Sequence, residues 1–175
     1  MDAPYTLLVN QTEHSNALLL RTNVLGSARP ATRCTMATML PEPHLINFGS
    51  GTGGVGHDGV RAFYANDLIG QFFPPDAEII PISRTIDEER LVDEIEVRFT
   101  HDRVITHLLP GVAPTGRRVE VAFVVVVGAK DGKVVYEHIY CDQAAMLVQL
   151  GLIEPNALPV GVDTAARLLA VMGKG

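Results

Sequence analysis

The sequence lacks tryptophan, and aromatic residues make up only 6% of its 175 positions. This leaves little material for the aromatic stacking platforms with which proteins bind single-stranded nucleic acid. An excess of basic residues is also missing, since the formal net charge is −6. Nucleic acid is bound through a concentrated basic surface, so we expect no nucleic-acid partner.

Cysteine is scarce, and long apolar runs are absent. Cys34 and Cys141 form neither a disulfide framework nor a metal-binding spacing. We interpret them as reduced thiols of a cytoplasmic protein and predict no metal site. The longest apolar run, residues 121–127, is far shorter than the roughly 20 residues of a membrane helix. The first residues also lack a signal-peptide pattern, so we expect no membrane partner.

The remaining composition is that of a globular chain, with 47% hydrophobic and 19% charged residues, and we expect a single domain over 1–175. Helical patterns come first along the chain, and strand patterns follow. The predicted helices are 5–25, 31–40, 59–73 (capped by Asp58), 143–150 and 163–172, and the predicted strands are 44–48, 77–85, 90–101, 117–129 and 133–140. This order predicts an α+β fold, with helices packed on a strongly curved antiparallel sheet.

Two predicted strands indicate which sides of the sheet are covered. In 90–101 the apolar set includes Phe99 and ends at His101, so both residues should face inward. Strand 117–129 is apolar on both faces, so we expect both faces to be shielded from water. Helices would pack on one face. A second copy of the chain would pack on the other, so we predict a homodimer through this side of the sheet.

The last strand carries an unusual row of polar side chains. With a period of two residues, Tyr136, His138, Tyr140 and Asp142 share one face. Buried polar tips need partners or water, so such a row more often lines a cavity than a packed core. The predicted substrate-binding residues of this pocket are Tyr136, Tyr140, His44, Tyr64 and Phe99.

The glycine-rich segment 49–54 fits the G-x-G-x-x-G pattern of dinucleotide-binding proteins. That pattern needs a parallel βαβ unit whose second strand ends at an acidic residue. Here Asp76 and Glu78 open the next strand instead. We therefore interpret the segment as a loop at the rim of a cavity, and predict no cofactor.

Three segments resemble SnoaL-like polyketide cyclases. Residues 109–119 resemble their G-x-x-P-T-G-[KR]-x-[VI] segment, 131–138 their D-G-K-[IV] hairpin, and 142–151 their D-x-x-x-x-L-x-Q-L-G ending. These cyclases belong to the nuclear transport factor 2-like superfamily, whose cone of helices and curved sheet encloses a deep pocket. The resemblance covers residues 56–151. The E-H-I-Y-x-D-Q motif, residues 137–143, is similar to that of an uncharacterised subgroup.

The resemblance implies a role for Asp142, which aligns with the carboxylate that serves the cyclases as general acid/base. His138 and His101 would then hydrogen-bond the developing oxyanion. The resemblance therefore implies Asp142, His138 and His101 as the catalytic residues. The expected function is a small cofactor-independent cyclase, isomerase or lyase that acts on a small apolar or aromatic carbonyl compound. The alternative is a non-catalytic ligand-binding or dimerisation module, in which Asp142 only caps the helix that follows it.

Overall fold

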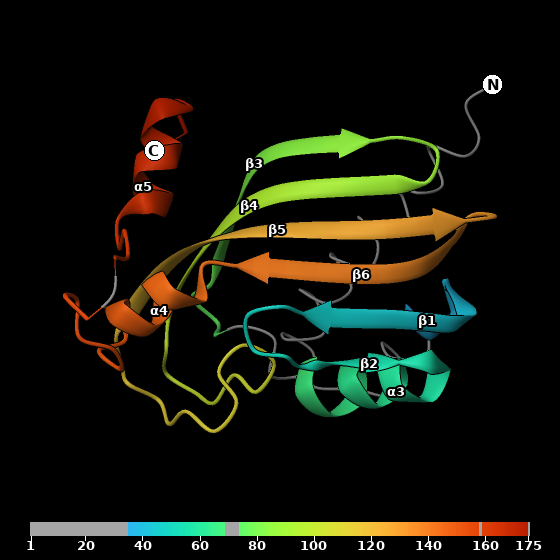
Figure 1. Cartoon of the computed structure of the whole chain (residues 1–175), viewed down its shortest axis with the longest axis horizontal. Helices are drawn as coiled ribbons and strands as arrows, with labels where there is room; N and C mark the ends of the chain where they lie inside the picture. The colour runs from blue at the N-terminus through green and yellow to red at the C-terminus, as the bar shows by residue number, and fades with distance from the viewer. Residues whose placement is uncertain (1–34, 69–73, 158, 175) are drawn as a thin grey trace.

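The computed structural model describes residues 35–68, 74–157 and 159–174, and its centre is a six-stranded sheet of order β2-β1-β6-β5-β4-β3 (Figure 1). The strands are β1 Met39–Asn47, β2 Gly53–Val55, β3 Glu78–Ile86, β4 Arg90–Thr100, β5 Arg118–Lys130 and β6 Lys133–Cys141. The helices are α3 Gly56–Phe63, the π-helical turn Tyr64–Leu68, α4 Gln143–Gln149 and α5 Thr164–Val171. The predicted helix 5–25 lies outside the described residues. Within them, no helix is long and apolar enough to cross a membrane.

The four strands predicted from residue 77 onward are confirmed to within one residue at each end. The hairpin predicted between the last two is also confirmed. Asp131 and Gly132 have φ angles of 52° and 71°, which is the positive pair that a two-residue type I′ turn requires. Period-two alternation therefore predicted the bounds of strands β3 to β6.

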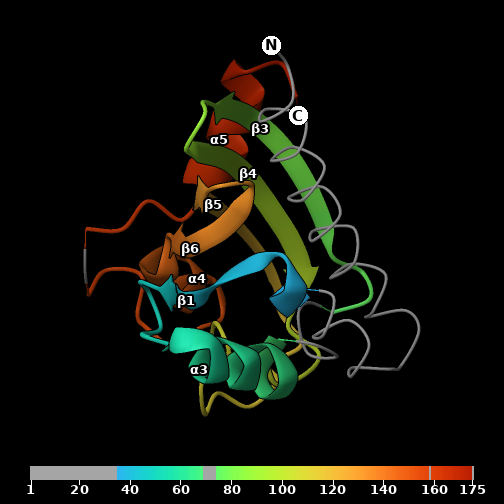
Figure 2. The same ribbon diagram turned by 90° about the vertical axis from the view of Figure 1, so that its right-hand side faces the viewer.

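The sheet is mixed, which corrects the expectation of an antiparallel one. Strand β1 pairs parallel with β6 and antiparallel with β2, while all other neighbours are antiparallel. A long stretch of chain separates β1 from β6, so their pairing is free of the reversal that a short hairpin imposes. The strands also rotate progressively from β3 to β1, as the view in Figure 2 shows.

The predicted helix 31–40 is wrong at its end, because β1 already begins at Met39. Pro41 and Pro43 stop a helix, but they lie here inside a strand. The β1–β6 register shifts between Met39 and His44, and such an irregularity tolerates residues that cannot donate a ladder hydrogen bond. The predicted cap of the next helix is wrong too. Val55 is the N-cap of α3 without a side-chain bond.

Among the described residues, two hydrophobic clusters lie on the inner face, one towards each end of the long strands of the sheet. The first contains Met36, Met39, Leu45, Val60, Phe63, Tyr64, Leu91, Val127, Ala129 and Val134, and the second Val97, Phe99, Ile105, Leu108, Leu109, Val119, Val121, Phe123, Met146 and Leu150. Ile139 packs against both clusters. The inward-facing Ile95, Val125 and Ile139, between the two clusters, are only partly buried.

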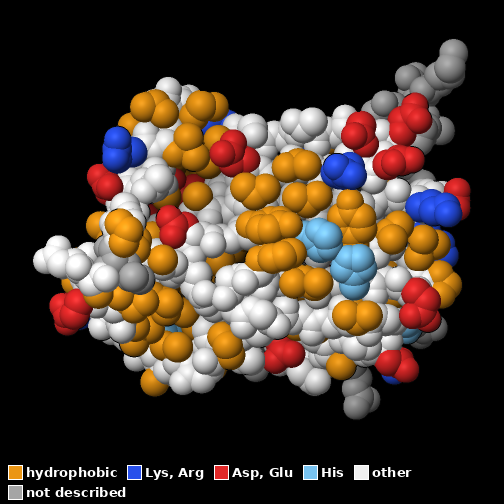
Figure 3. All heavy atoms as spheres, in the orientation of Figure 1, with side chains coloured by type: hydrophobic (Ala, Val, Ile, Leu, Met, Phe, Trp, Pro, Cys, Tyr) orange, Lys and Arg blue, Asp and Glu red, His pale blue; other side chains and the backbone are white. Residues whose placement is uncertain are grey.

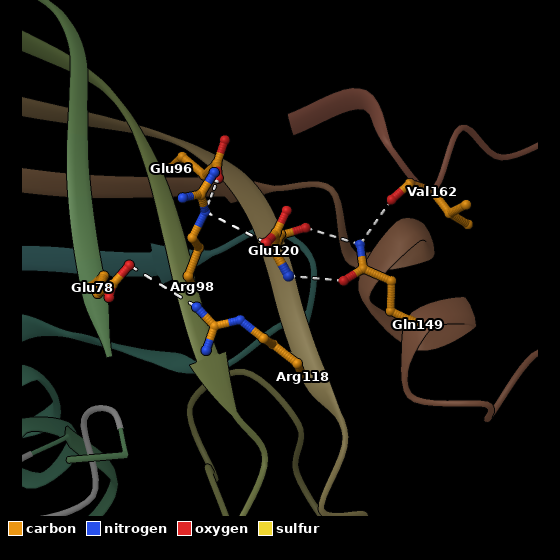
Figure 4. A network of polar contacts seen from close by, with 7 residues as sticks. All are labelled: Glu78, Glu96, Arg98, Arg118, Glu120, Gln149 and Val162. Carbon is orange, nitrogen blue, oxygen red and sulfur yellow. Dashed lines mark hydrogen bonds and ion pairs between the residues drawn. The ribbon is translucent and has the colours of Figure 1, made fainter. Parts of the chain in front are cut away.

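Gln149, from the predicted D-x-x-x-x-L-x-Q-L-G ending, ties α4 to the sheet (Figure 4). Its Oε1 accepts a hydrogen bond from Glu120 N at 2.8 Å, and its Nε2 donates to Glu120 O at 2.9 Å. The same Nε2 donates to Val162 O at 3.0 Å. The amide thus satisfies backbone groups of β5 and of the segment before α5. Gly151 follows with φ of 72°, as expected for the residue after a helix end.

Candidate active site

The row Tyr136, His138 and Tyr140 lies on the outer face of the sheet. The core residue Val127 pairs with Glu137, so Glu137 points inward. Successive side chains of a strand alternate between faces, and the neighbouring tyrosines and histidine therefore point outward. The expectation that this row lines an enclosed cavity was wrong, because the other set of β6 side chains faces the core.

The rings of this outward row stack with those of His44 and Phe48, which lie on and just after the neighbouring strand β1. Phe48 stacks on Tyr140 with ring centroids 4.3 Å apart, and Tyr136 stacks on His138 at 4.5 Å. His44 stacks on Tyr136 at 5.4 Å. In Figure 3 histidine side chains lie side by side within a hydrophobic area of this face. The predicted pocket residues His44, Tyr136 and Tyr140 thus form an open aromatic surface.

Asp142 is exposed and serves as the N-cap of α4. Its Oδ1 accepts a hydrogen bond from Ala145 N at 3.0 Å. It also lines a hollow of about 30 Å³ between β5, α4 and the segment that leads into α5, which is room for about one water molecule. This environment differs from the apolar pocket that would make a carboxylate a stronger base.

Asp142→Asn is therefore expected to change the free energy of unfolding by less than about 1 kcal/mol, because Asn and Asp cap helices about equally well. Asp142→Ala should cost about 1 kcal/mol. Urea denaturation near pH 7 measures both. The matched control is Asp163→Ala, since Asp163 is the N-cap of α5 without a side-chain hydrogen bond. A clear gain of stability in Asp142→Asn would show instead that the carboxylate is held charged at a cost.

The three predicted catalytic residues are not brought together. His101 N donates to Arg117 O, Asp142 N donates to Ala122 O, and His138 pairs with Val126. Arg117 lies just before β5, and Ala122 and Val126 lie within it. Successive positions of these three are five and four residues apart, which corresponds to roughly 17 and 13 Å along a strand. His101 also points to the inner face, and His138 to the outer one. One group that contains all three is excluded by this geometry.

The prediction that Phe99 and His101 face inward is confirmed. Phe99 belongs to the second core cluster, and His101 is buried. Thr115 N donates to His101 Nδ1 at 3.3 Å, so the proton of the neutral ring sits on Nε2. Burial lowers the pKa of His101, and Asp102 opposes this in part. The nearby His107 is also neutral at pH 7, because burial lowers its pKa to about 4.

The inner face holds a carboxylate that the sequence analysis did not select. Tyr64 Oη donates to Glu137 Oε2 at 2.9 Å. Burial raises the pKa of Glu137, and the hydrogen bond from Tyr64 opposes this. Burial and the nearby Glu137 raise the pKa of Tyr64 well above its usual value. The Glu137 side chain is only partly buried.

A second carboxylate of the inner face, Asp93, is already neutralised. Arg84 donates from Nε to Asp93 Oδ1 at 2.6 Å and from its terminal nitrogen to Oδ2 at 2.8 Å. Such a bidentate pair is strong and fixed in geometry. Glu137, by contrast, is hydrogen-bonded to a neutral phenol. Of these two inner-face acids, Glu137 is therefore the one suited to exchange a proton with a ligand.

Within the described part of the chain, no group of three or more His, Cys, Asp or Glu side chains is arranged to hold a metal ion. The glycine-rich segment does not form the predicted rim of a nucleotide site. It leads from β1 into β2, which pairs antiparallel with β1, whereas a dinucleotide fingerprint follows a strand of a parallel sheet.

Comparison with solved structures identifies this arrangement of sheet and helices. An NTF2-like protein from Burkholderia thailandensis matches with a TM-score of 0.55 and 14% identity, over 86% of this chain and 98% of that one. The chain has the nuclear transport factor 2-like fold. The predicted fold class, an α+β cone with this fold, is confirmed.

The structures with this fold that match include proteins named for polyketide cyclisation. A provisionally named SnoaL-like polyketide cyclase from Jannaschia sp. matches with a TM-score of 0.59 and 21% identity, over 82% of this chain and 94% of that one. IdmH of Streptomyces antibioticus, a provisional polyketide cyclase, matches with a TM-score of 0.51 and 23% identity, over 79% and 97%. No family model and no curated protein matches the sequence.

Proposed function

We propose that this chain is a small cofactor-independent enzyme of the cyclase, isomerase or lyase type, with Glu137 as general acid/base on a carbonyl compound. The observation that carries the proposal is the Tyr64–Glu137 pair on the inner face, at 2.9 Å. Apolar side chains of β4, β5 and β6 surround this position, which suits a small apolar or aromatic substrate. The structural likeness to the Jannaschia protein and IdmH is consistent with this class.

The raised pKa of Glu137 supports this role, because burial makes the carboxylate a stronger base once it is ionised. It would remove a proton from the carbon next to the carbonyl and return it later. Tyr64 has a raised pKa and stays protonated, so its hydroxyl can donate a hydrogen bond to Glu137 or to the enolate oxygen. We propose Glu137 rather than Asp142, because Asp142 is exposed and engaged as a helix cap.

Proton exchange at carbon tests this function without knowledge of the natural substrate. Aromatic and aliphatic ketones and 1,3-dicarbonyl compounds are incubated with the protein in D₂O, and mass spectrometry measures deuterium uptake. We expect faster uptake than in buffer for at least one apolar compound. Compounds that bind, as judged by ligand-observed NMR, but exchange at the buffer rate would favour the non-catalytic binding module.

We also propose a homodimer through the outer face. Its β5 side chains Val124 and Val126 are apolar, and Phe48 and Tyr140 beside them are 52% and 39% exposed. Isolated exposed apolar residues are ordinary, whereas a contiguous patch indicates an interaction site.

Light scattering should give the mass of two chains for the wild type and of one chain for Val126→Asp, because a charge buried between two sheets is unpaired. Ala62→Asp is the matched control, since Ala62 is exposed on α3 and not on the outer face of the sheet. A monodisperse wild-type monomer at working concentration would rule the dimer out.

A further inference from the structure

Two histidines of the outer face meet through their ring nitrogens. His44 on β1 and His138 on β6 lie on neighbouring parallel strands, and their Nε2 atoms are 2.9 Å apart. The ring centroids are 5.0 Å apart, and the ring planes are tilted by 36°. A single hydrogen between the two nitrogens accounts for this distance.

The backbone and the neighbouring ring hold this pair in place. His44 and His138 both stack on Tyr136, with interplanar angles of 18° and 22°. Gly128 of β5 lies opposite Tyr136, and a Cβ at this glycine would overlap the tyrosine ring. Both histidines are partly exposed in the single chain, so a solute can reach them before two copies associate through this face. The function proposed for the inner face makes no use of them.

We propose that His44 and His138 form a bidentate site for a divalent transition-metal ion of the Cu²⁺ or Ni²⁺ class. With metal–nitrogen bonds of about 2.0–2.1 Å, nitrogens 2.9 Å apart subtend an angle of about 90° at the ion. That is the angle between neighbouring ligands of a square-planar or tetragonal centre, the geometry that these ions favour with nitrogen ligands. Water molecules would complete the coordination.

The protonation chemistry of the pair is compatible with metal binding. Only neutral imidazole binds a metal. When both Nε2 atoms bind the ion, the hydrogen between them moves to Nδ1 of the ring that carried it, so no proton is lost from a neutral pair. The two nitrogens now meet nearly head-on, so each ring must turn by about 45° for its Nε2 lone pair to point at the ion.

Calorimetric titration of the full-length, tag-free protein with Cu²⁺ tests the proposal, with Ni²⁺ as a second probe. We expect a site that His44→Gln and His138→Gln each weaken by at least about tenfold, since even an outer-shell partner of a metal ligand is worth that much. His57→Gln is the matched control, because His57 lies in the first turn of α3 and is exposed. It should bind as the wild type does.

Electron paramagnetic resonance of the Cu²⁺ complex distinguishes this pair from scattered surface sites. The wild type should show coupling to two imidazole nitrogens, and each single variant coupling to fewer. Circular dichroism confirms that the variants fold. Binding of equal strength in the wild type and both variants, or no binding by the folded wild type, would overturn the proposal and leave the pair as a neutral hydrogen bond.

Discussion

Glu137→Gln is expected to lower protein-dependent deuterium exchange by about 100-fold or more, the usual contribution of a positioned general base. The substitution keeps the size of the side chain and an oxygen that can accept from Tyr64 Oη, but it removes the basic carboxylate. Binding of the carbonyl compound should change far less than the exchange rate. Mass spectrometry gives the rate, and ligand-observed NMR gives the affinity.

Asp142→Asn is the matched control, because it neutralises a carboxylate at the end of the same strand. The exchange rate should stay within about threefold of the wild type, since Asn replaces Asp as a helix cap without loss. If Asp142→Asn abolished exchange and Glu137→Gln preserved it, the role that the resemblance implied for Asp142 would be correct, and the assignment to Glu137 would be wrong.

Gly54→Ala is expected to destabilise the protein by about 3 kcal/mol, the upper range for overpacking a close contact. A Cβ at Gly54 would overlap the backbone carbonyl of Gly59 and lie 2.6 Å from Val60 N. Backbone atoms cannot turn aside as a flexible side chain can, so β2 and α3 would have to separate. Urea denaturation of both proteins measures the difference in the free energy of unfolding.

Gly59→Ala tests the same contact from its other side. A Cβ at Gly59 would meet Gly54 at 3.6 Å, an ordinary van der Waals distance. Because Gly59 lies within α3, alanine there should be neutral or stabilise the helix by up to about 1 kcal/mol. In this contact only Gly54 lacks room for a Cβ, so equal effects of the two substitutions would contradict the described packing of β2 on α3. The requirement for glycine at position 54 gives the glycine-rich segment a structural role.

Period-two alternation predicted β3 to β6 because each strand carries a continuous apolar set. It also identified the inner side of β4, where Phe99 and His101 follow Leu91 along one apolar face. The parallel partner of β1 could not be predicted, since its pairing with β6 is between segments far apart in sequence. The prolines of β1 are also typical of the end of a helix. The local sequence does not show that this segment pairs with a distant strand, so the strand could not be predicted there.

The sequence pattern of β6 does not show which of its faces points inward. Both of its side-chain sets combine polar and apolar residues, so the prediction that the row with the most polar groups lines the cavity is wrong. The other set places a single carboxylate, Glu137, between Val135 and Ile139. An acid in an otherwise apolar row was the signal that could have identified it. The register with β5, where Val127 faces Glu137, decides the question.

The acid/base role of Glu137 can be tested by ¹³C NMR titration of its carboxyl carbon. We expect a midpoint above the ordinary value of 4.5, because burial raises the pKa of Glu137. We also expect a further rise in Tyr64→Phe, since the hydrogen bond from Tyr64 lowers that pKa. A midpoint at or below 4.5 in the folded wild type would show a solvated or ion-paired carboxylate, and would contradict an acid/base role on the inner face.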